Sequence, residues 1–247
     1  MKNFTGEYAK RYDLMHRQKN YEAEVYRIRA ELEFRGIITP CSILDFGCGT
    51  GSHAMLLREQ GFEAWGYDQN SDMIAEARRK SIPHQRNFTT EFSDLPSHFQ
   101  AVYSLFDVVN YQVTPKQLQN YLDQIDSKLY SGGLLILDSW NKEVVMKDPP
   151  RDSSRTYVVE GKEFARKVSP TTSDNFQTTR LRIELIDLEQ SHCIQTEEHY
   201  MRAYLAHELS DIITKIGYTG VRIFDATDWN SGPTETSWRF GLSAIKL

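Results

Sequence analysis

Residues 42–51 read SILDFGCGTG, a short apolar run that leads into three glycines. The run 42–46 predicts a buried β-strand, and a helical pattern begins directly after the glycines at Ser52. Glycines at such a junction let the backbone turn sharply and let a ligand approach without Cβ atoms in the way. This strand–loop–helix unit predicts a ligand site at the carboxyl end of a strand in an α/β fold.

Strands and helices alternate on both sides of this unit, which is typical of a parallel sheet with helices on both faces. The expected strands are 42–46, 64–68, 101–106, 134–138, 221–224 and 238–245, and the expected helices are 52–60, 71–80, 115–130 and 206–216. Ser71 is the expected N-cap of its helix, and Gly132-Gly133 would end the helix that starts at Pro115. The pattern predicts a Rossmann-like, doubly wound, mostly parallel seven-stranded sheet.

Residues 151–204 break this alternation, because they predict strands without intervening helices. Leu181, Ile183 and Leu185 alternate with Arg182 and Glu184, as in a half-buried antiparallel strand. We therefore expect an antiparallel β insertion after the fifth strand, on the substrate side. The expected organisation is a helical segment at 1–36 over the cofactor site, a Rossmann-like domain at 37–150 and 205–247, and the insertion at 151–204.

The composition argues against several classes of protein, including nucleic-acid-binding, disulfide-rich and membrane proteins. The chain has 247 residues and a net charge of −5, without the basic balance of a nucleic-acid-binding protein. Its three cysteines form no C-x-x-C pair, so we expect no metal site and no disulfide framework. Residues 1–13 contain no apolar core of signal-peptide length and no run approaches the length of a membrane span, so we expect neither feature. We expect a cytoplasmic monomer or homodimer that acts on a small molecule.

The glycine loop favours S-adenosyl-L-methionine over a dinucleotide as the cofactor. A dinucleotide fold needs G-x-G-x-x-G, whereas here Ser52 occupies the position of the last glycine. Asp45 lies two residues before Gly47, where a carboxylate would repel a pyrophosphate but can help hold a cationic amino-acid head. An NAD-dependent oxidoreductase is therefore disfavoured.

Other residues are expected to complete the cofactor site. Asp68 ends the second strand, where a carboxylate can accept both ribose hydroxyls, although it could merely cap the next helix. Met73 follows where an apolar side chain could lie on the adenine, or simply pack its helix. The segment 105–111 should face the reacting groups, because ligands bind beyond the carboxyl ends of the strands. Within it, Asp107, Asn110 and Tyr111 are each a candidate contact or a helix cap.

Together these motifs resemble class I S-adenosylmethionine-dependent methyltransferases. The N-terminal runs 8–14 (YAKRYDL) and 19–24 (KNYEAE) further resemble bacterial N,N-dimethyltransferases of nucleotide-linked 3-amino sugars, of the desosamine and mycaminose type. The resemblance implies that Tyr12 and Tyr21 line the cofactor site and that Tyr12, Tyr111 and Arg239 approach the substrate. One departure is at 88–90 (FTT), where such enzymes often place an acidic residue after the third strand.

The expected cofactor contacts are Tyr12, Tyr21, Asp45, Gly47, Cys48, Gly49, Asp68, Gln69, Met73, Leu105 and Asn110, and the expected catalytic residues are Tyr12, Tyr111, His199 and Arg239. Arg239 could hold a phosphate or carboxylate of the substrate. An amine acceptor needs little activation, whereas a hydroxyl would need a base, for which His199 is the candidate. The other six histidines have no metal-ligand spacing, and we expect them to be surface or cap residues. The alternatives to a small-molecule N-methyltransferase are an O-methyltransferase and a cofactor-binding module without turnover.

Overall fold

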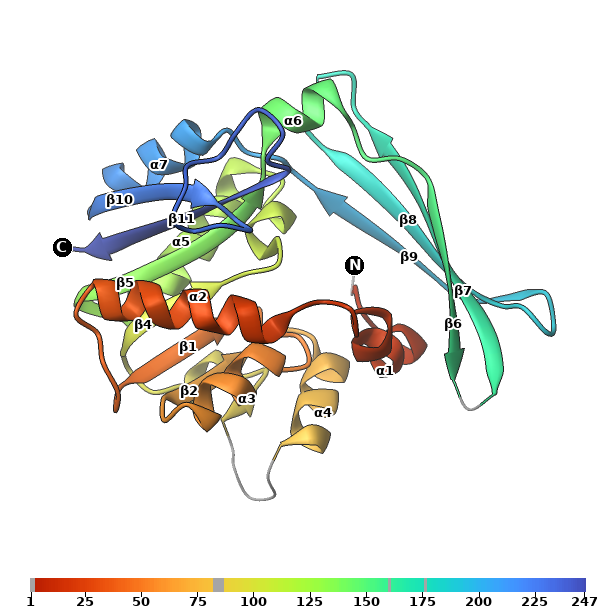
Figure 1. Cartoon of the computed structure of the whole chain (residues 1–247), viewed down its shortest axis with the longest axis horizontal. Helices are drawn as coiled ribbons and strands as arrows, with labels where there is room; N and C mark the ends of the chain where they lie inside the picture. The colour runs from red at the N-terminus through yellow and green to blue at the C-terminus, as the bar shows by residue number, and fades with distance from the viewer. Residues whose placement is uncertain (1–2, 82–86, 160, 176) are drawn as a thin grey trace.

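The chain is described by a computed structural model that covers residues 3–81, 87–159, 161–175 and 177–247. Two sheets dominate it: a seven-stranded main sheet and a four-stranded second sheet that extends to one side (Figure 1). The N-terminal helix α1 lies between them, close to the second sheet (Figure 1). The fold therefore brings the start of the chain to the junction of its two sheets.

The main sheet has the strand order β10-β11-β5-β4-β1-β2-β3. Its strands are β1 (Ser42–Phe46), β2 (Glu63–Tyr67), β3 (Phe88–Thr89), β4 (Phe99–Ser104), β5 (Leu129–Trp140), β10 (Tyr218–Asp225) and β11 (Arg239–Lys246). β1 pairs in parallel with both β2 and β4, and β11 pairs antiparallel with both β5 and β10. The strand order reverses beside β1, so the ligand crevice is expected at its carboxyl end.

Helices cover both faces of the main sheet. The helices of the described residues are α1 (Gly6–Met15), α2 (Tyr21–Phe34), α3 (Ser52–Glu59), α4 (Ser71–Lys80), α5 (Pro115–Lys128), α6 (Lys142–Lys147) and α7 (Ala206–Lys215), with short 3₁₀ turns η1 (Phe92–Asp94) and η2 (Val108–Tyr111). Apolar residues of α2, α3 and α4 form one buried cluster against the sheet, and those of α5 and α7 form another on the opposite face. The predicted doubly wound α/β fold is confirmed.

The second sheet follows β5 and α6 in the chain. Its strands β6 (Ser153–Val159), β7 (Lys162–Thr172), β8 (Thr179–Asp187) and β9 (His192–Met201) pair antiparallel in sequence order. One face packs on α1, where Tyr8 and Met15 share an apolar cluster with Tyr157, Phe164 and Leu185. The antiparallel insertion predicted after the fifth strand is confirmed.

Several local predictions are wrong. Asn70, not Ser71, caps α4, because its side chain accepts hydrogen bonds from the backbone of Asp72 and Met73. Gly132-Gly133 does not end the helix at Pro115 but lies inside β5, where Gly132 has a φ of +80° and the register with β4 shifts. A glycine with positive φ accommodates such an irregularity within a strand.

Two further predictions missed element boundaries. The N-terminal segment is two helices, α1 and α2, because the chain turns between His16 and Asn20, whose side chain caps α2. Residues 88–89 are the third strand, β3, rather than the segment after it. The segment after the third strand, where related enzymes often have an acidic residue, therefore begins later in the chain than predicted.

Candidate active site

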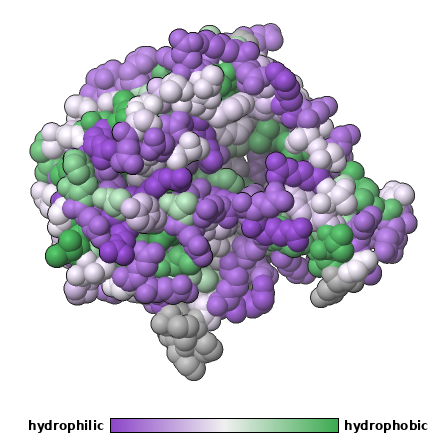
Figure 2. All heavy atoms as spheres, in the orientation of Figure 1, coloured by the Kyte–Doolittle hydropathy of each residue, from purple (hydrophilic) through white to green (hydrophobic). Residues whose placement is uncertain are grey.

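The carboxyl ends of β1, β2, β4 and β5 meet α1 and the second sheet in one region. The surface is hollowed where the body of the molecule faces the second sheet (Figure 2). Most residues singled out in the sequence lie on segments that border this region. It is therefore the candidate active site.

The glycine loop is fixed by the second strand. The backbone N–H groups of Gly47 and Cys48 both donate to the carbonyl of Tyr67, at 2.7 and 3.0 Å. Gly47 has a φ of +86°, and a Cβ there would lie 2.8 Å from the methyl groups of Val108. A side chain at Gly47 is therefore excluded by conformation and by space. The loop consequently keeps its backbone close to the turn that follows β4.

Cys48 and Leu105 contribute to the core rather than exposing their side chains. Both are buried in the apolar cluster under α2 and α3. The sulfur of Cys48 leaves no room for a side chain at Gly66, where a Cβ would lie 2.8 Å away. Any contact of Cys48 with a ligand in the crevice would therefore be made by its backbone.

Asp68 holds the glycine loop and the start of α4 together. Its Oδ2 accepts from the backbone of Gly49 at 2.9 Å, and its Oδ1 accepts from Asn70 at 2.9 Å. Burial raises the pKa of Asp68. Each carboxylate oxygen retains a second lone pair, so the group can also accept ligand hydroxyls. Gln69 is exposed beside it.

Asp45 lies at the end of β1 with an unsatisfied oxygen. The residue is 3% exposed, and its Oδ2 has no hydrogen-bond partner among the described residues. Burial raises the pKa of Asp45 to about 8; the nearby Tyr103 hydroxyl opposes this shift, and the charge of Asp68 adds to it. A buried carboxyl without a partner is costly unless a ligand completes it. The cationic amino-acid head of S-adenosylmethionine has the charge to do so, so these residues fit the expected cofactor.

The turn after β4 is strained. Phe106 and Asp107 have φ values of +68° and +67°, a conformation that costs free energy for residues other than glycine. The Asp138 carboxyl at the end of β5 compensates by accepting from both backbone N–H groups, at 3.0 and 2.8 Å. Burial, reinforced by the neighbouring Asp138, raises the pKa of Asp107. Strained turns of this kind cluster at functional sites, which supports the placement of the site here.

Arg239, at the start of β11, lies beside this pair of carboxyls. Its Nη1 is 3.8 Å from Asp107 Oδ1 and 3.7 Å from Asp138 Oδ2. The guanidinium also lies over the ring of Phe106, 5.7 Å from its centroid. The structure thus gives Arg239 two acidic neighbours within the protein, which would compete with an anionic ligand.

Asn110 is fully buried and ties three segments together. Its Nδ2 donates to Ser139 Oγ at 3.1 Å and to the carbonyl of Arg202 at 2.5 Å. Its Oδ1 accepts from the backbone of Trp140 at 3.2 Å. These bonds join η2 to β5 and to the segment after β9, so a cofactor contact by Asn110 remains a prediction.

Tyr111, His199 and Glu197 form a hydrogen-bonded chain. Tyr111 Oη and His199 Nδ1 are 2.8 Å apart, and His199 Nε2 lies 2.8 Å from Glu197 Oε2. Burial would raise the pKa of Glu197, but hydrogen bonds from His199 and from the backbone of Thr5 and Phe4 outweigh it and lower the pKa. Because an ionised carboxylate only accepts, we assign the proton of His199 to Nε2 and the Tyr111 hydroxyl as donor to Nδ1.

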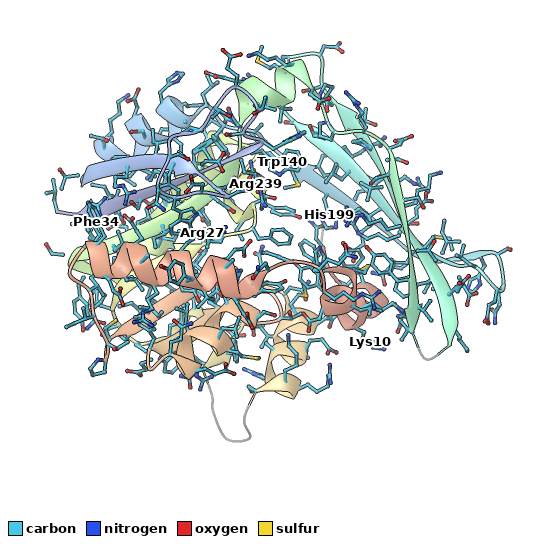
Figure 3. All side chains as sticks on the ribbon, viewed as in Figure 1. Lys10, Arg27, Phe34, Trp140, His199 and Arg239 are labelled. Carbon is cyan, nitrogen blue, oxygen red and sulfur yellow. The ribbon has the colours of Figure 1, made fainter. Side chains whose placement is uncertain are left out.

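The N-terminal helices bring further aromatic rings to the site. Tyr12 is buried, and its ring lies 4.2 Å from that of His16, centroid to centroid. Tyr21 begins α2, and its ring contacts His53 edge-on. Met73 is buried with Tyr12 in the apolar cluster that α1 forms with the second sheet. The Met73 Cε atom would lie 3.7 Å from a Cβ added at Gly49, so this side chain lies beside the glycine loop. Figure 3 places His199 and Arg239 between the main sheet and the second sheet.

Sequence reasoning missed several residues here. Lys19 Nζ lies 3.6 Å from the centroid of the Phe106 ring and 3.0 Å from Glu24 Oε2. His53 is buried and bonded to Glu24 at 2.6 Å, so the expectation of a surface or cap position is wrong for it. His84 lies outside the described residues. The approach of residues 19–24 to the strand ends depends on tertiary packing, which no local pattern reveals.

Among the described residues, no group of histidine, cysteine or acidic side chains has the geometry to hold a metal ion. No helix in the same residues is long and apolar enough to span a membrane.

Comparisons with known proteins agree with this geometry. A family model described as a methyltransferase domain matches residues 15–223. A dTDP-3-amino-3,6-dideoxy-α-D-glucopyranose N,N-dimethyltransferase of Streptomyces fradiae is 27% identical over 252 residues, 94% of this chain and 95% of the relative. The predicted similarity to amino-sugar N,N-dimethyltransferases is therefore confirmed.

Solved structures share the fold over nearly the whole chain. A sugar N-methyltransferase of Streptoalloteichus sp. has a TM-score of 0.77 at 20% identity, covering 95% of this chain and 92% of that one. An amino pentose methyltransferase of Micromonospora echinaspora, solved with S-adenosylmethionine bound, has a TM-score of 0.71 at 19% identity, covering all of both chains. Because the family model spans most of the sequence, this chain belongs to the methyltransferase domain family, and its methyl donor is S-adenosyl-L-methionine.

Proposed function

We propose that this enzyme transfers a methyl group from S-adenosylmethionine to the amine of a nucleotide-linked amino sugar, as a monomer or homodimer. The observation that carries the proposal is the similarity to the Streptomyces fradiae enzyme over 94% of the chain. That extent includes the second sheet, which borders the candidate active site. Similarity confined to the glycine loop would support only a shared cofactor.

Three groups of the chain would hold the cofactor. The Asp45 carboxyl suits its ammonium group, the Asp68 carboxyl suits its ribose hydroxyls, and the backbone at 47–49 gives close approach without side chains. Met73, Gln69 and the tyrosines of the N-terminal helices would line the rest. When bound, S-adenosylmethionine supplies a methyl group on a positively charged sulfur, so the protein mainly has to align the acceptor.

Tyr12 and Tyr111 would orient the acceptor amine. The Tyr111–His199–Glu197 chain would have a further role, because it could accept the proton that the acceptor nitrogen loses on methylation. A proton leaving the acceptor would bind Tyr111 Oη while the Tyr111 proton moves to His199 Nδ1. The imidazolium so formed would be stabilised by the Glu197 carboxylate, which lies 2.8 Å away. In this scheme Glu197 is a positioning residue, because it acts only through His199.

The same chain favours one second candidate, an O-methyltransferase. A buried imidazole backed by a carboxylate is a suitable general base for a hydroxyl acceptor. The two candidates differ in how they depend on that base. An amine becomes nucleophilic once its own proton is lost to solvent at raised pH, whereas an alcohol stays protonated throughout the accessible pH range.

The His199→Ala variant distinguishes these candidates when kcat is measured from pH 6 to 10, with the Streptomyces fradiae enzyme's amino-sugar substrate and with hydroxyl analogues. For an amine we expect kcat to fall about tenfold at pH 7 and to recover at pH 9–10. Glu197→Gln should cause a smaller loss with the same pH dependence. His207→Ala, an exposed histidine on α7, is the control.

A loss of about 100-fold or more that persists at every pH would instead indicate a hydroxyl acceptor. Absence of turnover by the wild type with every aminated sugar nucleotide would contradict the proposed substrate class.

A further inference from the structure

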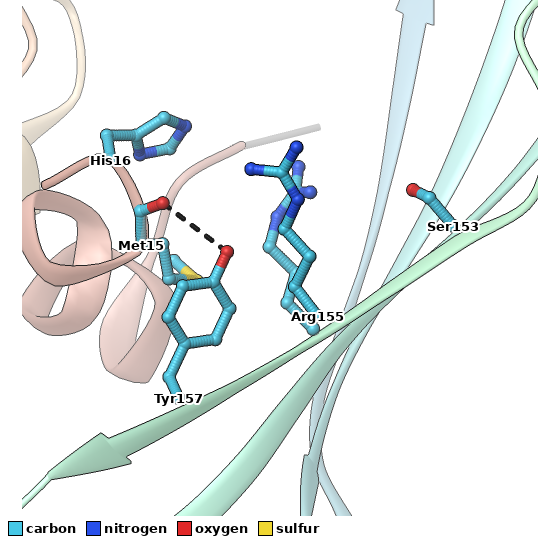
Figure 4. Close-up of a pocket in the computed structure, with 6 residues that line it drawn as sticks. Met15, His16, Ser153, Arg155 and Tyr157 are labelled. Atoms are coloured by element: carbon cyan, nitrogen blue, oxygen red, sulfur yellow. Dashed lines mark hydrogen bonds between the residues drawn. The ribbon is translucent and has the colours of Figure 1, made fainter. Parts of the chain in front are cut away.

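A cavity of about 230 Å³ lies where the end of α1 meets β6 and β7. Its lining residues are Met15, His16, Ser153, Arg155, Tyr157 and Arg166. Tyr157 closes one side, since its hydroxyl donates to the carbonyl of Met15 at 3.3 Å, and Arg155 points from β6 toward the side on which His16 lies (Figure 4). The cavity is thus shared between the N-terminal helix and the second sheet.

The two arginines lie side by side on the neighbouring strands β6 and β7. Arg155 and Arg166 are direct partners in the antiparallel register, so their side chains share one face of the sheet. Like charges at directly opposite positions destabilise a sheet. Within the described part of the chain, neither arginine has an ion pair with an acidic residue, whereas Arg180 and Arg182 of β8 pair with Glu198 and Glu184.

The other polar groups of the cavity do not offset this positive charge. Arg166 is oriented by its Nε, which donates to the hydroxyl of Tyr8 at 3.0 Å. His16 is neutral at pH 7, because burial, with Arg166 and Lys19 nearby, lowers its pKa to about 4. No lining residue carries a negative charge. The cavity therefore has two cations and no compensating anion.

The cavity adjoins the candidate active site through His16. The His16 ring lies 4.2 Å from the Tyr12 ring and 5.4 Å from the Phe106 ring, centroid to centroid. Phe106 belongs to the strained turn at the end of β4. A ligand anchored in the cavity would thus have its far end directed to the tyrosines and the strand ends.

We propose that Arg155 and Arg166 bind the phosphate or diphosphate group of the methyl acceptor, the role that the sequence suggested for Arg239. Planar guanidinium groups bind phosphate oxygens in a bidentate manner, and an opposed pair can hold two phosphates or clamp one. Arg239 is less suited, since Asp107 and Asp138 lie within 3.8 Å of it. This inference rests on the proposed function, because it names the anion-binding residues for that substrate.

The test is calorimetric titration of the full chain with thymidine diphosphate, inorganic diphosphate, thymidine and citrate. The variants are Arg155→Gln, Arg166→Gln, the double variant, Arg239→Gln, and Arg180→Gln/Arg182→Gln as a control on the same sheet. We expect each single variant to weaken thymidine diphosphate binding about tenfold and the double variant about 100-fold. The Kd for S-adenosylmethionine should change less than about twofold, since neither arginine lies at the glycine loop.

A second measurement separates loss of binding from loss of folding. The double variant should melt at the same or a higher temperature than the wild type without ligand, because a repulsive cross-strand pair is removed. The added stability given by thymidine diphosphate should disappear in this variant.

The following binding results would overturn the inference. They are no binding of either diphosphate by the wild type, undiminished binding by the double variant, equal binding of thymidine without phosphates, or a loss confined to Arg239→Gln. Tighter binding of citrate than of diphosphate would assign the arginines to a carboxylate and equally contradict it. Diphosphate binding that needs both arginines, without turnover of any amino sugar, would uphold the anion site while refuting the proposed function.

Discussion

The glycine-loop edge of the main sheet and the face of the second sheet differ in how they are made. At the first, backbone groups and two buried acids, Asp45 and Asp68, lie within 24 residues of chain. At the second, side chains from α1 meet side chains from β6 to β9, which lie far from α1 in the sequence. The first region presents two buried carboxyl groups, and the second presents two arginines, Arg155 and Arg166, that have no ion-pair partner among the described residues.

This difference matches the two ligands expected. A cofactor with a fixed structure and a cationic head suits a rigid backbone cradle with buried carboxyls. An acceptor that varies among related enzymes suits side chains on a separate sheet, which can change without disturbing the parallel strands. The two halves of the site should therefore respond independently to mutation, and the following variants test that independence.

The largest effect is expected from Asp68→Ala. It removes the carboxylate that would bind the ribose hydroxyls and that holds Gly49 and Asn70, so the Kd for S-adenosylmethionine should rise about 100-fold or more. Asp68→Asn keeps an acceptor oxygen and should cost less. Calorimetry with thymidine diphosphate should give an unchanged Kd. If both ligands weakened equally, the two halves would not be independent.

A smaller effect concerns the proton on Asp45. With a pKa of about 8, this carboxyl is mostly protonated at pH 7 in the free protein, and a bound cation should ionise it. Binding of S-adenosylmethionine at pH 7 should thus release about one proton, and affinity should rise as the pH is raised toward 8. Calorimetry in buffers of different ionisation enthalpy measures the release. Asp45→Asn should abolish it, and an equal release by this variant would assign the proton to another group.

The smallest effect on binding is expected far from both halves. Thr114 caps α5 through a reciprocal pair of hydrogen bonds with Gln117. Thr114→Ala should lower the free energy of unfolding by about 1 kcal/mol, measured by denaturant titration. Both Kd values should stay unchanged. A shift in either one would mean that α5 is coupled to the site.

The sequence predicted the local parts of this molecule well. The strand–glycine–helix unit at 42–60 and the acid at Asp68 are encoded by neighbouring residues, so their pattern survives without tertiary information. The alternation of Leu181, Ile183 and Leu185 likewise predicted the insertion, since one face of β8 packs on α1. Gly132-Gly133 led to the wrong prediction of a helix end, because a glycine with positive φ is found at strand irregularities as well as at helix ends.

The partners of each side chain were not predictable in the same way. His199 was singled out alone, but its bond to Glu197, two residues earlier on the same face of β9, gives it an oriented proton. Arg155 and Arg166 carry no motif, and only the β6–β7 register brings them opposite each other. Such pairings depend on contacts between residues distant in sequence, which one sequence does not encode in any local pattern.

The chain leaves the main sheet for the second sheet and returns from it at neighbouring positions. Asn141 and Tyr204 form a bridge just where the chain leaves β5 and where it returns to α7. The backbone of Lys142 donates to the carbonyl of Tyr204, and that of Tyr204 to the carbonyl of Trp140. Because these two points are hydrogen-bonded to each other, the length and side chains of the segment between them can change while the end of β5 and the start of α7 keep their positions.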